Sequence, residues 1–267
     1  TDLTNQGLRI FTTLDPLAQT RIQESFKDTV ARLSKSNPGR LKDLQGAVLV
    51  AHPENGELVA AVGSTQDFTG FNRTVDAKRQ LGSLLKPVIF LTALESNRYN
   101  WASPIEDSEI SIKSDGKTWT PKNYSGRGHG MVPMIQALSQ SYNLSTVRLG
   151  QEFGLSTFIN HLKQFGVTSN ILSYPSIYLG AVDMSPMEVM NIYGNFATGG
   201  FRYPVKAIRS VVDANGRSLD RYSLSVQPTI DPAAAYALNY GSQQVMASGT
   251  GRAAYSSLPR SLNLAGK

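Results

Sequence analysis

Ser83 and Lys86 stand three residues apart in the segment Gly82-Ser83-Leu84-Leu85-Lys86-Pro87. A serine hydroxyl becomes an effective nucleophile when a base takes its proton, and a lysine whose pKa is lowered by burial or by other cations can be that base. If Ser83 opens a helix, the two side chains share one face. The N-terminus of that helix would stabilise the negative charge that develops during attack. The spacing therefore predicts a serine nucleophile activated by a lysine.

The same spacing recurs in Ser114-Asp115-Gly116-Lys117 and provides an internal comparison. Asp-Gly marks a turn, so this second pair cannot share a helix face. The residues that follow Ser83 are apolar and predict a buried helix over residues 83–95. We therefore expect the chemistry at Ser83 and not at Ser114.

Ser141-Tyr142-Asn143 lies at a break between two predicted helices, residues 132–140 and 144–153. Serine and asparagine at such a break are commonly helix caps. In the catalytic interpretation, the Ser141 hydroxyl relays a proton and the Asn143 side chain, which both donates and accepts, holds a substrate amide. A second match, Ser261-Leu262-Asn263, falls in a strand-like stretch and predicts no such break. Lys267 follows that stretch and indicates nothing by itself.

Composition limits the other mechanisms. The chain of 267 residues has no cysteine, which excludes disulfides, cysteine nucleophiles and thiolate zinc sites. Of its three histidines, His52 and His161 have no metal-pair spacing and are expected to be structural or exposed. For His129, in the glycine-rich loop 126–130, contact with the edge of a substrate and no role at all are equal alternatives.

The charge and the apolar pattern also exclude some classes of partner. The net charge is +6, but the 26 basic residues are scattered, so an anionic polymer or headgroup is favoured over nucleic acid. The segment Gly249-Thr-Gly-Arg-Ala-Ala254 matches a relaxed dinucleotide fingerprint, yet it follows a predicted helix and is expected to be a tight turn between helices. No apolar run approaches the roughly 18 residues that span a bilayer.

The elements that must position these residues are strands, then a long helical region, then strands again, which predicts a mixed α/β domain with a helical subdomain. Strands are expected at residues 7–13 and in two hairpins, one at 46–62 and one from 207 onward. Helices are expected to begin after Asp15-Pro16, to cover residues 154–165, to follow the capping box Ser185-Pro-Met-Glu188, and to run from Asp231 to Met246. Residues 34–40 are expected to be a loop, and residues 101–130 a polar surface excursion.

Ser-x-x-Lys, Ser-x-Asn and Lys-Thr-Gly, in that order, are the motifs of the penicillin-recognising serine enzymes. The first two are present, and Lys267 stands where the third begins. Over essentially its whole length the chain resembles the transpeptidase domain of bifunctional class A penicillin-binding proteins, in particular the 1b type of Gram-negative bacteria. The residues that carry this resemblance are Gly7-Leu-Arg-Ile-Phe-Thr-Thr-Leu-Asp-Pro16, Gly46-Ala-Val-Leu-Val50, Phe71-Asn-Arg73, Gly82-Ser-Leu-Leu-Lys-Pro87, Trp119-Thr-Pro-Lys-Asn123, Ala137-Leu-Ser-Gln-Ser-Tyr-Asn143, Leu179-Gly-Ala181, Ser185-Pro-Met-Glu188 and Gly249-Thr-Gly-Arg252.

The resemblance implies an α/β (α+β) fold of the serine transpeptidase and β-lactamase type, with an antiparallel sheet flanked by helices and a helical subdomain. It implies a D,D-transpeptidase that cross-links peptidoglycan stem peptides. Ser83 would attack the D-Ala-D-Ala carbonyl with Lys86 as base, and Ser141 would pass the proton toward the leaving D-alanine. Asn143 would bind the donor peptide amide, and Lys267 would hold the terminal carboxylate and tune Ser141. No cofactor and no metal are implied.

The same resemblance implies the surroundings of the enzyme. The partners would be stem peptides and glycan strands derived from lipid II, and in the cell regulators of wall synthesis. β-Lactams would trap Ser83 as a slowly hydrolysed ester. Nucleic acid is not among the implied partners. The domain would lie on the periplasmic side of the bacterial inner membrane, held by an N-terminal anchor outside this sequence. The longer protein would also be a peptidoglycan glycosyltransferase.

The resemblance stops at Lys267, because the threonine and glycine of the third motif are absent from the sequence. So are the strand amide that completes the oxyanion hole and the last strands of the sheet. We therefore expect the fold to be truncated at the third motif. A molecule made of this chain alone would be neither stable nor active, so we expect the chain to be part of a longer protein. Residues 1–45 are expected to be a linker strand and helix, and residues 46–267 an incomplete transpeptidase domain.

Two other functions remain open. A β-lactamase or β-lactam sensor would share the fold, but a class A β-lactamase needs a deacylating glutamate in a Glu-x-x-Leu-Asn loop, and Glu188 is better explained as part of a helix cap. A non-catalytic module that binds the anionic cell wall would be consistent with the charge of +6. Labelling of Ser83 by a fluorescent penicillin distinguishes the enzyme from the binding module.

Overall fold

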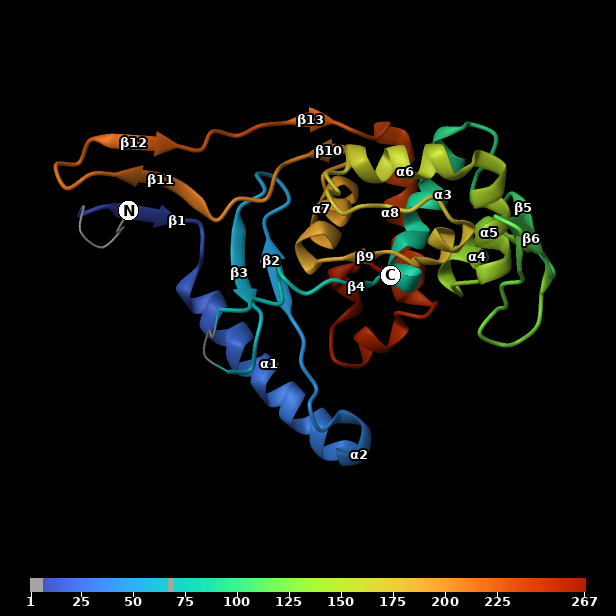
Figure 1. The fold of residues 1–267 in the computed structure, drawn as a ribbon, viewed down its shortest axis with the longest axis horizontal. Helices are drawn as coiled ribbons and strands as arrows, with labels where there is room; N and C mark the ends of the chain where they lie inside the picture. The colour runs from blue at the N-terminus through green and yellow to red at the C-terminus, as the bar shows by residue number, and fades with distance from the viewer. Residues whose placement is uncertain (1–6, 67–69) are drawn as a thin grey trace. The chain divides into compact units, whose positions relative to one another are not determined.

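The computed structural model describes residues 7–66 and 70–267 (Figure 1). The chain divides into two compact units. Unit 1 comprises the chain up to Lys78 together with Ser185–Gly194 and Phe201–Gln227, and unit 2 comprises Arg79–Met184, Asn195–Gly200 and Pro228–Lys267. No helix in the described part of the chain is both long and apolar enough to cross a membrane.

Unit 1 is built from short antiparallel sheets and helices α1 and α7. Its elements are β1 (Arg9–Thr12), α1 (Pro16–Ser36), α2 (Pro38–Leu41), β2 (Val48–Ala51), β3 (Leu58–Val62), α7 (Pro186–Ala197, whose last residues count with unit 2), β10 (Phe201–Arg202), β11 (Ile208–Val212), β12 (Ser218–Arg221) and β13 (Gln227–Pro228, whose second residue counts with unit 2). The strands β1, β11 and β12 form one sheet, and β2 pairs with β3. Both predicted hairpins are confirmed.

Local rules account for the ends of the helices. Asp15 caps α1 by accepting from the backbone N–H groups of Leu17 and Ala18 at 2.8 and 3.1 Å. The predicted capping box of α7 is formed, because Ser185 N donates to the Glu188 carboxylate at 3.0 Å and Glu188 N donates to Ser185 Oγ at 3.3 Å.

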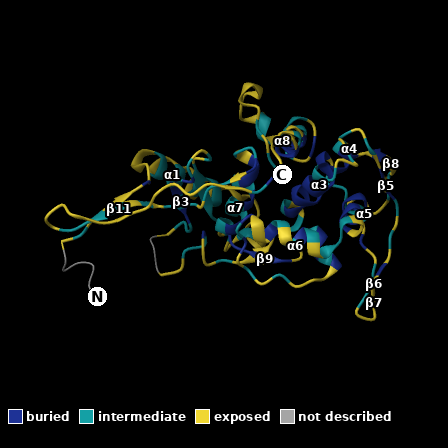
Figure 2. Ribbon diagram, turned by 90° about the horizontal axis from the view of Figure 1, so that it is seen from above, coloured by how far each residue is buried: buried dark blue, intermediate teal, exposed yellow. Residues whose placement is uncertain are grey.

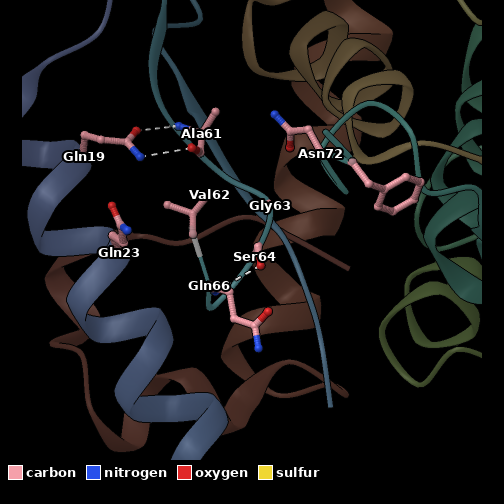
Figure 3. Close-up of a pocket in the computed structure, with 9 residues that line it drawn as sticks. Gln19, Gln23, Ala61, Val62, Gly63, Ser64, Gln66 and Asn72 are labelled. Carbon is pink, nitrogen blue, oxygen red and sulfur yellow. Dashed lines mark hydrogen bonds between the residues drawn. The ribbon is translucent and has the colours of Figure 1, made fainter. Parts of the chain in front are cut away.

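The amide side chain of Gln19 joins α1 to β3 through two hydrogen bonds to the backbone of Ala61 (Figure 3).

Unit 2 surrounds one helix that is apolar on every side. Its elements are β4 (Arg79–Gln80), the 3-10 helix η2 (Gly82–Leu85), α3 (Lys86–Glu95), β5 (Pro104–Asp107), β6 (Ile112–Ser114), β7 (Lys117–Trp119), β8 (Gly130–Pro133), α4 (Met134–Ser139), α5 (Asn143–Phe153), α6 (Leu155–Gln164), η3 (Pro175–Leu179), β9 (Asp183–Met184), α8 (Pro232–Ala247), η4 (Arg252–Ser256) and η5 (Arg260–Leu262). Every residue of α3 from Lys86 to Leu94 is buried (Figure 2), and the helices α4, α5, α6 and α8 pack around it. A helix without a polar face is stable only in such a core.

Three local predictions were wrong, and a fourth was right only in part. In the predicted loop 34–40, α1 continues to Ser36 and the Asn37 side chain caps a new turn that begins at Pro38. Residues 130–133 pair with β5 as strand β8, so the helix predicted from Val132 begins at Met134. Residues 260–262 form a 3-10 turn, and the run before Lys267 is not a strand. The excursion 101–130 is ordered as predicted, but it contributes buried residues to unit 2, including Asp107 and Asn123.

A close contact between α8 and the ring of Trp101 allows one test of this core. The indole Nε1 donates to the carbonyl of Ala237 at 2.8 Å, so the ring is held in place, and a Cβ added at Gly241 would lie 2.7 Å from its Cη2 atom. We expect Gly241→Ala to lower the free energy of unfolding by about 1–3 kcal/mol, measured by urea denaturation. Gly194→Ala in α7 is the control, because no described heavy atom beyond its chain neighbours and the backbone of its own helix lies within 4 Å of the added Cβ. This variant should raise stability by up to about 1 kcal/mol. Equal effects at the two glycines would contradict this packing.

Candidate active site

Ser83 and Lys86 lie on one face at the start of the central helix. Ser83 is exposed in η2, whereas Lys86 is 1% exposed as the first residue of α3. Residues three apart eclipse one another in a 3-10 helix, and the backbone N–H of Lys86 donates to the Ser83 carbonyl. The predicted shared face is thus present, with the hydroxyl at the surface and the amine beneath it.

The backbone ahead of Ser83 is held by a second glycine. The N–H groups of Leu81 and Gly82 both donate to the carbonyl of Gly180 at 3.1 Å. Gly82 and Gly180 have φ values of +56° and +77°, which are favourable only for glycine. A Cβ at Gly180 would overlap the backbone nitrogen and oxygen of Gly82. This contact of two backbones places the turn that presents Ser83.

Ser141 occupies a position that normally belongs to glycine. After α4 ends, the N–H of Tyr142 donates to the carbonyl of Ala137 at 2.9 Å and the N–H of Ser141 donates to that of Leu138 at 3.1 Å. These two bonds are the Schellman arrangement of a helix C-terminus, whose left-handed residue is usually glycine. Here it is Ser141, with φ of +60°. A left-handed residue other than glycine costs about 1 kcal/mol or more, and such strain clusters at functional sites.

The amine of Lys86 is directed at the Ser141-Tyr142-Asn143 turn. Its Nζ donates to the Ser141 carbonyl at 2.6 Å, to the Asn143 Oδ1 atom at 2.6 Å and to the Ser141 Oγ atom at 3.2 Å. The Ser141 hydroxyl in turn donates to the Ser83 Oγ atom at 3.0 Å. The structure therefore connects Lys86 to Ser83 through the hydroxyl of Ser141, and all four residues lie in unit 2.

Two features lower the pKa of this amine. Burial, followed by the positive charge of Lys267, lowers the pKa of Lys86 to about 7, against a smaller raising effect of the Asp107 carboxylate. Burial also lowers the pKa of Lys267 to about 8, and its Nζ donates to the carbonyl of Leu138 at 2.6 Å. A substantial fraction of Lys86 is therefore neutral near pH 7 and able to accept a proton.

Neither Ser141 nor Asn143 caps the N-terminus of α5 with its side chain, so the interpretation of this motif as an N-cap was wrong. The N-cap residue is Tyr142, whose side chain makes no capping bond. The Asn123 Oδ1 atom accepts from the N–H groups of Asn143 and Leu144 at 2.6 and 3.2 Å, and the Asp107 carboxylate accepts from Ser145 N at 3.0 Å. Capping by remote side chains leaves the Asn143 amide free to contact Lys86.

Sequence reasoning did not single out Asp107 or Asn123 as members of this site. Asp107 is 0% exposed and ends β5, and its carboxylate also accepts from Asn123 Nδ2 at 2.7 Å. The segment Trp119-Thr-Pro-Lys-Asn123 was part of the family resemblance, which was the available signal for Asn123. No motif or spacing points to Asp107, because its partners lie far from it in the sequence.

The competing candidates lie in arrangements without this geometry. Ser114 and Lys117 face each other across the Asp115-Gly116 turn of a hairpin, as predicted. His161 bonds to Thr92 and Glu95 at 2.9 and 3.1 Å, near the opposite end of α3 from Lys86. Gly249 and Gly251 form the tight turn between α8 and η4.

A hollow of about 230 Å³ in unit 1 also lacks the groups for catalysis (Figure 3). Among its described lining residues no side chain is ionisable; they include Gln19, Gln23, Ser64, Gln66, Phe71 and Asn72.

Comparison with known proteins identifies the family. Residues 46–267 match the penicillin-binding protein transpeptidase domain. The chain belongs to this family. It is 37% identical over 252 residues to penicillin-binding protein 1B of Vibrio cholerae, covering 93% of this chain and 32% of that protein. It is 35% identical over 267 residues to penicillin-binding protein 1B of Escherichia coli, covering 98% of this chain and 31% of that protein.

Solved structures of class A relatives have the same fold. Penicillin-binding protein 1A of Haemophilus influenzae superposes with a TM-score of 0.85 at 19% identity, over 96% of this chain and 58% of that chain. The PonA1 protein of Mycobacterium tuberculosis in complex with penicillin V superposes with a TM-score of 0.77 at 26% identity, over 91% of this chain and 65% of that chain. The predicted fold, mixed helices and antiparallel sheet of the transpeptidase type, is therefore confirmed. The chain spans about a third of the length of the 1B proteins that it matches.

The contact between Gly180 and Gly82 predicts a defect in this penicillin-binding domain. In Gly180→Ala the new Cβ displaces Gly82 and with it Ser83, so labelling by a fluorescent penicillin should slow by roughly tenfold or more. Gly216→Ala is the matched control, since Gly216 has a similar φ of +81° and, in the described chain, no heavy atom beyond its two chain neighbours lies within 4 Å of the added Cβ. A labelling rate for Gly180→Ala equal to that of Gly216→Ala would show that the contact does not position Ser83.

Proposed function

We propose that this chain carries a D,D-transpeptidase site that cross-links peptidoglycan stem peptides through an acyl-enzyme at Ser83. One observation carries the proposal: the exposed Ser83 hydroxyl is joined through Ser141 to a buried amine whose pKa is about 7. A hydroxyl with a base of matched pKa within relay distance is the requirement for nucleophilic catalysis without histidine.

In the acylation step Lys86 acts in its neutral form. The Ser83 proton passes to Lys86, either directly or through the Ser141 hydroxyl, while the Ser83 Oγ atom attacks the penultimate D-Ala carbonyl of the donor peptide. The tetrahedral intermediate then expels the terminal D-alanine. Its amine takes the proton from Lys86 by way of Ser141, and Ser83 is left as an ester. The 3.2 Å and 3.0 Å bonds that Ser141 makes to the two partners support this relay.

Asn143 and Lys267 are proposed to bind the donor peptide. One N–H of the Asn143 amide donates to the Lys122 carbonyl at 2.7 Å, so its second N–H is available to the peptide. Lys267 would hold the terminal carboxylate, and its positive charge, which lowers the pKa of Lys86, couples carboxylate binding to the base. The ester is then attacked by the amine of a neighbouring stem peptide, which forms the cross-link and regenerates Ser83.

The longer protein is proposed to be a peptidoglycan glycosyltransferase as well, acting on glycan strands derived from lipid II. It would be held on the periplasmic side of the inner membrane by a single-pass anchor. Regulators of wall synthesis would be its partners. The penicillin-binding proteins 1B that the chain matches are about three times as long as this chain. We further propose that residues 1–45 lead into the catalytic domain and that residues 46–267 belong to it.

A β-lactamase or β-lactam sensor is the alternative of the same fold. The capping box argues against the first of these, because the Glu188 carboxylate is buried and accepts from Ser185 N, a position that serves the helix. Covalent complexes of a transpeptidase persist, whereas a β-lactamase hydrolyses them. The lifetime of the penicillin ester on Ser83 therefore distinguishes a transpeptidase from a β-lactamase, and formation of D-Ala-D-Ala cross-links distinguishes it from a sensor.

Substitution of the two Ser-x-x-Lys serines tests the nucleophile. We expect Ser83→Ala to abolish covalent labelling by a fluorescent penicillin, because the attacking oxygen is removed, and Ser114→Ala to label at the wild-type rate. Mass spectrometry of the labelled peptide should place the adduct on Ser83. Labelling that persists in Ser83→Ala would refute the assignment, and a wild-type protein that is never labelled would favour the binding module.

The pKa of Lys86 predicts how acylation depends on pH. Because the base works in its neutral form, the acylation rate should rise as pH increases through about 7. The charge of Lys267 lowers this pKa, so Lys267→Gln should raise it and move the rising limb to higher pH. The exposed Lys163 on α6 provides the control, and Lys163→Gln should leave the limb in place. A limb that stays in place or moves to lower pH in Lys267→Gln would exclude this coupling.

A further inference from the structure

The strained conformation of Ser141 needs support from outside its own turn. Its left-handed backbone presents both the carbonyl and the hydroxyl to Lys86 Nζ. A serine that relaxed to negative φ would turn these two oxygens away from the amine, and the link to Ser83 would break. The two hydrogen bonds of the Schellman turn require a left-handed residue at this position, but they favour glycine there and do not remove the strain that a serine carries.

The ring of Tyr142 is fixed by a neighbour from another segment. It lies parallel to the imidazole of His129, with 4.1 Å between ring centroids and 10° between the planes. Since Tyr142 follows Ser141 directly, a fixed ring limits the rotation of the peptide between them. The glycine-rich loop 126–130 therefore contributes a side chain, that of His129, which packs on the middle residue of the second motif.

His129 is itself held by a buried carboxylate. Its Nδ1 atom lies 2.7 Å from Asp107 Oδ2, and its backbone N–H donates to the Asp107 carbonyl at 2.8 Å. The other oxygen of Asp107 accepts from Ser145 N in the first turn of α5. One carboxylate thus reaches both sides of the Ser141-Tyr142-Asn143 turn, through His129 on one side and through α5 on the other.

We propose that His129 and Tyr142 form a clamp, anchored on Asp107, that keeps Ser141 in its left-handed conformation and so preserves the proton path between Ser83 and Lys86. This inference rests on the proposed transpeptidase function for its kinetic consequence, but the conformation of Ser141 tests it independently. His129 and Tyr142 are positioning residues, because they act on the reacting groups only through Ser141.

Four variants separate the two contacts of the clamp. His129→Phe keeps an aromatic ring and loses the hydrogen bond to Asp107, whereas His129→Asn keeps a donor and loses the ring. Tyr142→Leu removes the stacking partner, and Tyr142→Phe retains it. Asp107 is left unchanged, because its loss would leave several buried donors without a partner and so threaten folding.

His161→Asn is the matched control. Like His129, His161 bonds to a carboxylate, that of Glu95 at 3.1 Å, and lies parallel to an aromatic ring, that of Phe165, with 3° between the planes. It lies on α6, next to the end of α3 that is remote from Lys86. Its loss should lower thermal stability without slowing acylation of the folded protein.

The experiment measures acylation by a fluorescent penicillin in the full-length protein, the melting temperature of each variant, and the φ angle of Ser141 in crystal structures. We expect His129→Phe, His129→Asn and Tyr142→Leu to acylate roughly tenfold to 10²-fold more slowly than wild type while remaining folded at the assay temperature, and Tyr142→Phe to recover most of the rate. In Tyr142→Leu, Ser141 should leave the left-handed region.

Opposite results are equally clear. Wild-type acylation rates in His129→Phe and Tyr142→Leu, or a slowing that matches the one in His161→Asn, would overturn the clamp. So would a Ser141 that keeps positive φ in Tyr142→Leu, whatever the kinetics. A wild-type protein that penicillin does not acylate would instead refute the proposed function, while the φ angle of Ser141 would still decide whether the clamp exists.

Discussion

The burial of one amine determines the rest of this site. An ammonium group in an apolar core is costly unless acceptors surround it, and the sequence after Ser83 is so apolar that Lys86 is 1% exposed. Acceptors come from the Ser141 carbonyl, the Ser141 hydroxyl and the Asn143 amide. Because these atoms must point at Nζ, the turn that carries them must present all three acceptors to the same side. The same desolvation lowers the pKa of Lys86 to about 7 and makes the amine a base.

Meeting this constraint forces departures from ordinary local structure. Ser141 stands where the Schellman turn favours glycine, because a glycine would supply the carbonyl but no hydroxyl. The first turn of α5 is capped by Asn123 and Asp107, since Asn143 is occupied with Lys86. Gly82 and Gly180 pack backbone to backbone so that Ser83 emerges above the amine. Each departure is unfavourable by local preference. Each helps to bring together the same four atoms, which are Ser83 Oγ, Lys86 Nζ, Ser141 Oγ and Asn143 Oδ1.

Several elements could be predicted because their signals are local. The caps at Asp15, Ser185 and Asp231 lie within a few residues of the N–H groups that they bind, so they can be identified from sequence alone. The wrong prediction at residues 34–40 missed a local cap at Asn37, whereas the one at residues 130–133 fell where a distant segment decided the outcome. Residues 130–133 are extended because β5 pairs with them, and residues 260–262 form a helical turn where the pattern suggested a strand. Pairing partners that lie far away in the chain leave no trace in the periodicity.

The sequence by itself determined that Ser83 and Lys86 share a helical face and that Ser141 and Asn143 lie at a helix break, since both follow from spacing and chain stiffness. It also excluded cysteine chemistry and left only three histidines for any histidine mechanism, because folding does not change which residue types are present. Only the tertiary structure decided that Ser141 lies between Ser83 and Lys86, that Lys267 lowers the pKa of that amine, and that Asp107 and His129 support the turn. Those relations depend on distances between segments tens of residues apart, which burial and packing set and which spacing along the chain does not record.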